Sequence, residues 1–335
     1  MIPGDIGAEL GLRASGSWRP VPAADGGGPG SYATSLAFQL AGASGRTPGE
    51  EAAGLAARLR GAGWVSAASV TGGGYLTVTV TQARLAGLAV RIPAAGTACA
   101  SSDALRGTEL AAPAEPDPAP AATWGQARQA VAAAITGRLA LAAGAEVKSL
   151  SVPVRIPPAP GSAPYPAVAF AGADAVRYAL ARTDPGRPGG VSATGCARND
   201  LGNPYFAVRY AHAHAASVLR WAAGLGLDRG PAGAFRPGAL AHPAELELLS
   251  MMSWLPERTA AAARRRRPDA FLRYLETLAA AWLACWESCA ALPFAGRAAP
   301  RDEAETAARL WLAAAARTAL GTALRLAGLV PPERM

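Results

Sequence analysis

The sequence predicts an α+β domain at the N-terminus, a short α/β unit in the middle and an all-α helical bundle over the C-terminal half. Three observations support this prediction. Apolar residues alternate with threonine over residues 75–81, which is typical of a half-buried strand. The run Thr-Pro-Gly-Glu-Glu at residues 47–51 is a helix start signal, with threonine at the cap and acids in the first turn. From Gly172 onward the pattern is helical nearly to the C-terminus.

Shifts in composition divide the chain into four segments. We expect an N-terminal domain over residues 1–92, a Pro/Ala-rich linker over 93–122, an α/β unit over 123–170 and a helical domain over 171–335. The linker is poor in bulky apolar residues and ends in four closely spaced prolines. Within the α/β unit we expect one helix over about 125–143 and a strand near 147–156. The helical domain is predicted to hold helices over about 203–225, 243–263, 268–292 and 301–329.

Composition restricts the class of protein. The 335 residues carry 32 Lys+Arg against 24 Asp+Glu, a net charge of +8, and 51% are hydrophobic, which excludes wholesale disorder. Lys148 is the only lysine, so the other basic residues are arginines. The planar guanidinium group of arginine can bind a phosphate through two hydrogen bonds at once. The alanine, arginine, glycine and proline bias also fits a GC-rich genome. No apolar window suits a membrane span and no signal peptide is evident, so we expect a soluble cytoplasmic protein that does not act at a membrane.

The cysteines predict neither a disulfide scaffold nor a metal site. A chain this long does not depend on four cysteines for its fold. Cys285 and Cys289 are spaced by four on a predicted helix, but a structural metal needs four ligands and no others lie nearby in sequence. We therefore expect buried free thiols and no bound metal.

The stretch 203–214 is more informative. It reads Asn-Pro-Tyr-Phe-Ala-Val-Arg-Tyr-Ala-His-Ala-His. This resembles Asn-Pro-x-Tyr-Tyr-x-Gln-Tyr-Ala-His-Ala-Arg, which opens the helical, DALR-type anticodon-binding domain of arginyl-tRNA synthetases, a class I family. The Asp-Ala-Val-Arg-Tyr run at 174–178 and the closing Pro-Glu-Arg-Met at 332–335 also resemble that family. Residues 31–40 are similar to its Asp-Tyr-x-x-Asn-x-Ala-Phe-Gln-Leu, in the extra N-terminal domain that contacts tRNA.

The resemblance implies a reduced catalytic core. Class I synthetases bind ATP with His-x-Gly-His and Lys-Met-Ser-Lys signatures, whose groups meet developing negative charge. The counterpart of the first is residues 123–126, where Thr123 and Gln126 stand at the histidine positions and Gly125 is kept. The second needs lysines that the chain lacks. The interval from residue 123 to about 171 has room for roughly one and a half βαβ units of about 30 residues. We therefore expect a remnant of the Rossmann-like domain, in a truncated paralogue that uses no cofactor.

The resemblance also implies which residues meet tRNA. The residues expected on the anticodon side are Tyr205, Arg209, Tyr210, His212, His214 and Met335. The residues expected on the D-loop side are Tyr32, Phe38 and Gln39. The run Arg264, Arg265, Arg266 and Arg267 is a candidate for phosphate contact. The alternative for the aromatic and histidine positions is packing within the bundle, and the alternative for the arginine run is a solvated helix end.

We therefore predict a tRNA-binding protein related to arginyl-tRNA synthetases and without aminoacylation activity. Two alternatives remain open. One is a shortened enzyme that activates arginine or uses charged tRNA as its substrate. The other is an interaction module that has lost RNA binding and contacts a full-length synthetase or another protein, which the changed positions Ser31, Ser35, Arg209 and His214 would permit.

Overall fold

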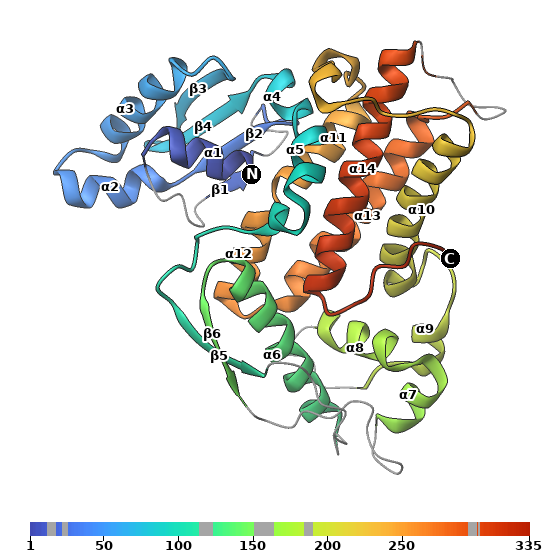
Figure 1. Cartoon of the computed structure of the whole chain (residues 1–335). Coiled ribbons are helices and arrows are strands. Elements are labelled where there is room, and N and C mark those ends of the chain that lie inside the picture. The colour runs from blue at the N-terminus through green and yellow to red at the C-terminus, as the bar shows by residue number, and fades with distance from the viewer. Residues whose placement is uncertain are drawn as a thin grey trace. The chain divides into compact units, whose positions relative to one another are not determined.

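The structure of the chain is a computed structural model (Figure 1). It describes residues 1–11, 18–21, 26–113, 123–150, 164–183, 190–293, 300 and 302–335. Contacts divide the chain into two compact units. The first unit consists of Met1–Cys99, Val218–Glu257 and Ala284–Ala315. The second consists of Ala100–Ser217, Arg258–Leu283 and Ala316–Met335.

An antiparallel sheet forms the centre of the N-terminal part of the first unit. Its four strands lie in the order β1-β2-β4-β3. Their bounds are β1 Trp18–Pro20, β2 Ser31–Thr34, β3 Val65–Thr71 and β4 Tyr75–Val80. The predicted alternation is confirmed in β4, where Leu76, Val78 and Val80 are buried and the residues between them are half-buried. The chain then turns at Thr81, whose side chain caps the next helix.

Helices pack on this sheet as their start signals indicate. The helices preceding β3 are α1 Ile2–Glu9, α2 Leu36–Ser44 and α3 Pro48–Arg60. The predicted start of α3 is confirmed, because Thr47 and Glu50 form a reciprocal capping box. The buried residues of α3, such as Leu55 and Leu59, belong to the face that packs on β3 and β4. The helix therefore covers the sheet with the stripe that its sequence predicts.

The first part of the predicted linker is folded. After α4 Gln82–Ala86, helix α5 runs over Leu88–Ala95 and a 3-10 helix, η2, over Gly96–Ala100. Cys99 and Ala100 are buried at the end of this segment. The prediction of a linker from residue 93 is wrong here. Small residues can be buried where two segments pack closely, although they give only a weak apolar signal in the sequence.

The second unit contains one parallel βαβ element (Figure 1). Strand β5 Glu109–Pro113 pairs in parallel with β6 Glu146–Leu150, and α6 Trp124–Ala142 lies between them in the chain. The predicted helix over 125–143 is confirmed within a residue. Strand β5 corrects the linker prediction, because its Glu-Leu-Ala-Ala sequence is a poor strand signal and takes its order from pairing with β6. The part of the predicted strand beyond Leu150 lies outside the described residues.

The remainder is helical. The helices that follow β6 are α7 Tyr165–Ala171, α8 Ala173–Arg182, α9 Ala193–Ala197, α10 Pro204–Gly224, α11 Pro243–Ser253, α12 Leu255–Arg265, α13 Pro268–Ser288 and α14 Glu303–Leu326. Two short 3-10 turns, η3 Ala232–Ala234 and η4 Pro237–Ala239, precede α11. The helix predicted over 243–263 is two helices, because the chain breaks at Trp254 and restarts with Pro256 in the first turn of α12. The predicted fold class is confirmed. Within the helices that the structure describes, none is long and apolar enough for a bilayer.

Candidate nucleic-acid interface

The start of α10 is fixed by Asn203. Its side-chain oxygen accepts a hydrogen bond from the Tyr205 amide at 3.1 Å. Its side-chain nitrogen donates to the carbonyls of Cys196 at 3.0 Å and Arg198 at 2.7 Å. Pro204 follows at the first helical position, where no backbone donor is needed. The Asn-Pro pair therefore ties α9 to α10 and sets the direction of the first turn of α10.

Tyr205 in the first turn and Arg209 in the second turn of α10 form a cation–aromatic pair. The Arg209 guanidinium carbon lies 4.9 Å from the centre of the Tyr205 ring. The other neighbour of this ring is Tyr178 of α8, with ring centres 5.9 Å apart. Both Tyr205 and Arg209 are half-buried, and burial raises the pKa of Tyr205. The phenol therefore stays neutral and the pair presents a ring and a cation together, the combination that binds unpaired bases.

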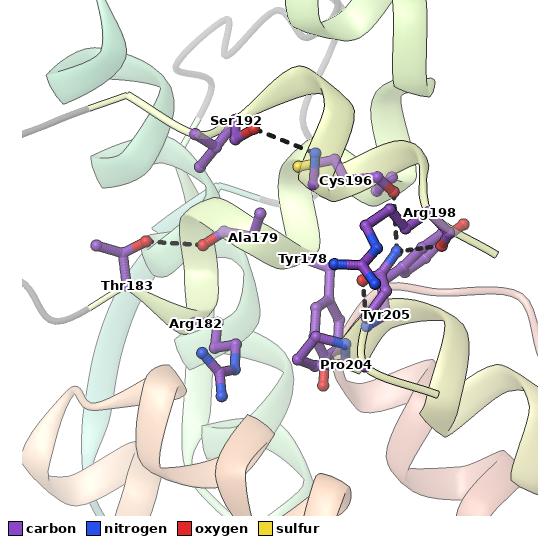
Figure 2. Close-up of a pocket in the computed structure, with 14 residues that line it drawn as sticks. Tyr178, Ala179, Arg182, Thr183, Ser192, Cys196, Arg198, Pro204 and Tyr205 are labelled. Carbon is purple, nitrogen blue, oxygen red and sulfur yellow. Dashed lines mark hydrogen bonds between the residues drawn. The ribbon is translucent and has the colours of Figure 1, made fainter. Parts of the chain in front are cut away.

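A cavity of about 340 Å³ opens beside Tyr205 (Figure 2). Tyr178, Arg198, Pro204 and Tyr205 gather at one end of it, and Arg182 and Thr183 lie at the other. Its two arginines are ion-paired. Arg182 binds both carboxylate oxygens of Glu276, at 2.7 and 3.1 Å, and Arg198 binds Asp200 at 2.9 Å.

The two tyrosines that line the cavity are uncharged, and its two arginines are each paired with a carboxylate. The Tyr178 hydroxyl donates to Glu276 at 3.1 Å, and burial and this carboxylate raise the pKa of Tyr178 well above its ordinary value. Because Arg182 and Arg198 are each matched by a carboxylate, the cavity suits a flat polar group better than a free anion. An unpaired base meets that description.

A row of aromatic side chains continues along α10. Phe206 stacks on Tyr210 with ring centres 5.8 Å apart and an interplanar angle of 13°. Tyr210 contacts His214 at 5.9 Å, and His214 contacts Trp282 of α13 at 5.8 Å. Phe206, Tyr210 and His214 are half-buried. This row shows that Tyr210 and His214 are held by neighbouring rings and retain some exposed surface.

His212 holds the C-terminal tail. Its side chain is 3% exposed, and its Nδ1 donates to the Pro332 carbonyl at 2.9 Å. It packs directly on α14, where a Cβ at Gly321 would lie 3.0 Å from its Nε2. Met335, at the end of this tail, is 54% exposed. His212 therefore anchors the C-terminal tail from within the protein. Of the two predicted tRNA contacts His212 and Met335, the exposed one is Met335.

Acid should weaken this anchor. Burial lowers the pKa of His212 from its ordinary 6.5, so the unfolded chain binds the proton more readily than the folded chain. The stability contributed by neutral His212 is complete above about pH 6.5 and is lost as the pH falls toward the lowered value. We expect the urea midpoint of the wild type to fall more between pH 7 and pH 5 than that of His212→Gln. Parallel curves for the two proteins would contradict this assignment.

The arginine run ends α12 and is only partly exposed. Arg264, Arg265 and Arg266 are exposed, and Arg266 has a left-handed φ of 52° as the helix terminates. Arg267 is bound to the buried Asp269 through two hydrogen bonds of 2.8 Å. Burial works against ionisation of Asp269, but the bonds and charges of Arg267 and Arg273 hold its pKa below the usual value. Arg267 therefore joins α12 to α13, and the other three side chains face solvent.

The structure separates the D-loop candidates. Tyr32 is fully buried, with its hydroxyl 2.8 Å from Ser253 Oγ and its ring centre 5.0 Å from that of Trp254. Its side chain therefore belongs to the core of the first unit and is not available to a ligand. Gln39 is exposed, and Phe38 is 43% exposed.

Phe38 belongs to an exposed aromatic patch that motif matching did not reveal. Its ring centre lies 5.1 Å from that of Tyr75, and the Arg19 guanidinium lies 4.3 Å above the Tyr75 ring. Gly74 makes this contact possible, since a Cβ there would meet Pro48 at 2.7 Å and the Phe38 ring at 3.0 Å. The glycine run before β4 was the available signal for this close approach.

The residues predicted to be the counterpart of an ATP signature lie at the start of helix α6. Thr123 is the N-cap, and its Oγ1 accepts from the Gln126 amide at 3.2 Å. Gly125 lies within the first helical turn and has an ordinary negative φ. The sole lysine, Lys148 on β6, forms an exposed ion pair with Glu109 on β5 at 2.7 Å. At these positions the described side chains serve the local βαβ structure.

The predicted free thiols are present in the structure. All four cysteines are free and buried. Over the ranges that the structure describes, His, Cys, Asp and Glu form no group of three or more that could hold a metal ion.

Comparison with known proteins defines the class of the C-terminal region. Residues 208–335 match the family described as DALR anticodon binding domain. This region, which includes most of α10 and the C-terminal tail, is therefore similar to the DALR anticodon binding domain.

The resemblance to arginyl-tRNA synthetases is confirmed by individual relatives. The chain is 37% identical to the arginine–tRNA ligase of Clavibacter sepedonicus over 168 residues, covering 49% of this chain and 28% of that protein. It is 38% identical to the ligase of Frankia alni over 164 residues, covering 49% and 29%. These matches thus span less than a third of the length of the relatives. The arginyl-tRNA synthetase of Thermus thermophilus has a similar fold, with a TM-score of 0.65 at 16% identity over 99% of this chain and 98% of that one.

Proposed function

We propose that this protein binds tRNA through its anticodon-binding region and does not attach arginine to it. The observation that carries the proposal is the half-buried Tyr205–Arg209 pair beside the cavity, at the entrance of α10. A base that packs against this pair would meet an aromatic ring and an arginine guanidinium, the two kinds of group on which unpaired bases stack. The row from Phe206 to His214 and the exposed Met335 extend the surface along the same unit.

Two further contacts complete the proposed interface. Phe38 and Gln39 would meet an unpaired base of the D-loop, because Phe38 offers an exposed ring edge and Gln39 an amide that can pair with a base. Arg264, Arg265 and Arg266 would bind backbone phosphates. Tyr32 and Arg267 take no part, since both are committed to internal contacts. We place this activity in the cytoplasm, where the proposed ligand is found.

Loss of aminoacylation is inferred from the α6 region. Thr123 and Gln126 stand where the resemblance implies imidazoles, and the Thr123 side chain is used as a helix cap. The only lysine is ion-paired with Glu109. In residues 100–217, as far as they are described, two strands form a single βαβ element. This provides no extended parallel sheet against which ATP and arginine could be placed.

A titration with bulk tRNA tests the binding proposal. We expect binding at low salt that weakens steeply as salt is added, because neutralised phosphates release counterions. Tyr205→Ala should reduce affinity by about 1–3 kcal/mol, or about 5- to 150-fold, if a base stacks there. Tyr165→Ala is the matched control, because Tyr165 is 36% exposed on α7 and outside the proposed interface.

Two results would contradict the proposal. Absence of binding at low salt would favour an interaction module that binds another protein. A pull-down with and without RNase would then show whether captured proteins bind directly or through RNA. Equal affinity losses for Tyr205→Ala and Tyr165→Ala would remove the stacking site. ATP–pyrophosphate exchange with arginine is expected at background level, and robust exchange would show that the protein is an enzyme.

A further inference from the structure

A second cavity, of about 300 Å³, lies in the second unit and takes no part in the proposed interface. Three arginines from three different segments line it: Arg138 of α6, Arg177 of α8 and Arg325 of α14. The remaining wall is largely apolar and includes Val131, Ile135 and Leu329. The arginines are far apart in the sequence, and only folding brings them together.

Two of these arginines are fixed in place. Arg138 Nε donates to the Leu326 carbonyl at 3.2 Å, and its guanidinium lies close against Gly328, whose φ of 78° shapes the turn after α14. A side chain at Gly328 would collide with this guanidinium. Arg177 Nη1 donates to Asp174 Oδ1 at 3.0 Å. Hydrogen bonds within the protein therefore hold two of the three arginines that line the cavity.

The described residues that line the cavity include three arginines and no aspartate or glutamate. Arg177 is paired with Asp174, and Arg138 caps the carbonyl end of α14 at Leu326. Arg325 is exposed, and no ion pair links it to an acidic residue within the described ranges. The lining thus presents guanidinium groups over an apolar floor, with Arg325 accessible to an anion from solvent.

We propose that this cavity binds a phosphate group on a ligand of about the size of one nucleotide. Guanidinium forks match phosphate oxygens in pairs, and the apolar floor would contact the rest of the ligand. The volume lies at the lower end of that of small-molecule sites, which suits one nucleotide. The phosphate could belong to a free nucleotide or to the RNA backbone. The proposal does not depend on tRNA binding, because a free phosphate would occupy the same arginines.

Arg325→Gln tests the site with little risk to the fold, because the side chain is exposed. Arg236→Gln is the matched control, since it removes the same charge from an exposed residue. Arg236 immediately precedes η4 and does not line the cavity. Thermal unfolding is followed with inorganic phosphate, with 5′-AMP and with chloride at equal ionic strength. tRNA titrations over a salt series are run on the same three proteins.

Either of two results would support the site. The first is stabilisation by phosphate or 5′-AMP in the wild type and Arg236→Gln, with affinity at least fivefold weaker in Arg325→Gln, which identifies a free ligand. The second is no effect of free phosphate, together with a salt slope for tRNA that is smaller by about one in Arg325→Gln alone, which identifies the RNA backbone. If Arg325→Gln matches Arg236→Gln in all assays, the proposal is overturned, and tRNA binding by both variants would leave the proposed function intact.

Discussion

Replacing Arg309 with methionine is expected to lower the free energy of unfolding by about 3–5 kcal/mol near neutral pH. Arg309 Nε binds Glu245 at 2.7 Å, Nη2 binds Glu305 at 2.9 Å and Nη1 donates to the Ala290 carbonyl at 3.1 Å. The three charged side chains are at most 10% exposed. Methionine keeps most of the apolar stem but removes the cation that two buried carboxylates share, and the loss of this buried charge pairing is the main cost.

Chemical denaturation near neutral pH measures this loss. An exposed ion pair serves as the control that separates the cost of a buried charge from the loss of an ordinary surface pair.

The control for this prediction is Arg317→Met. Arg317 binds Glu333 at 2.8 Å, but both side chains are about half exposed. An exposed pair of this kind contributes about 0–1 kcal/mol. A similar loss in both variants would contradict a special cost for the buried ion pairs of Arg309.

Local signals predicted the elements that depend on neighbouring residues. The capping box at Thr47 and the alternation in β4 are properties of a few adjacent residues, and both are present in the structure. Strand β5 was missed because its alanines carry little strand preference and its order comes from β6, more than 30 residues away. The break between α11 and α12 was likewise hidden, since Pro256 is tolerated in a first turn and ends no pattern by itself.

The same difference between local signals and long-range contacts applies to the site residues. The family signature identified Tyr205 and Arg209, and the structure brings them into one pair. The same kind of match could not separate Tyr32 from Phe38, because burial of Tyr32 depends on Ser253 and Trp254 from a distant part of the chain. The arginines of the second cavity could not be grouped from the sequence, because Arg177 belongs to the 174–178 run but comes close to Arg138 and Arg325 only on folding.

Tyr32→Ala is expected to destabilise the protein by about 3–5 kcal/mol, as do other truncations of fully buried aromatic residues. The ring is fully buried against Trp254, and the hydroxyl bonds to Ser253 Oγ, which in turn donates to the Ser250 carbonyl at 2.6 Å. Tyr32→Phe should cost only about 1 kcal/mol, because it removes one hydrogen bond and keeps the ring. Urea denaturation of the two variants measures both losses, and near-equal losses would contradict a packing role for the ring.

Phe38→Ala should give the opposite pattern, a small change in stability and a large change in tRNA affinity. Its ring is 43% exposed and contacts Tyr75 at the surface, so truncation opens no sealed cavity. If a D-loop base stacks on it, affinity should fall about 5- to 150-fold. Val70→Ala is the control, because Val70 is 36% exposed on β3 of the same unit and outside the proposed interface. Unchanged affinity in Phe38→Ala would confine the tRNA contacts to the remaining candidates, whereas a loss shared with Val70→Ala would mean that the effect arises from the fold of the domain and not from a stacked base.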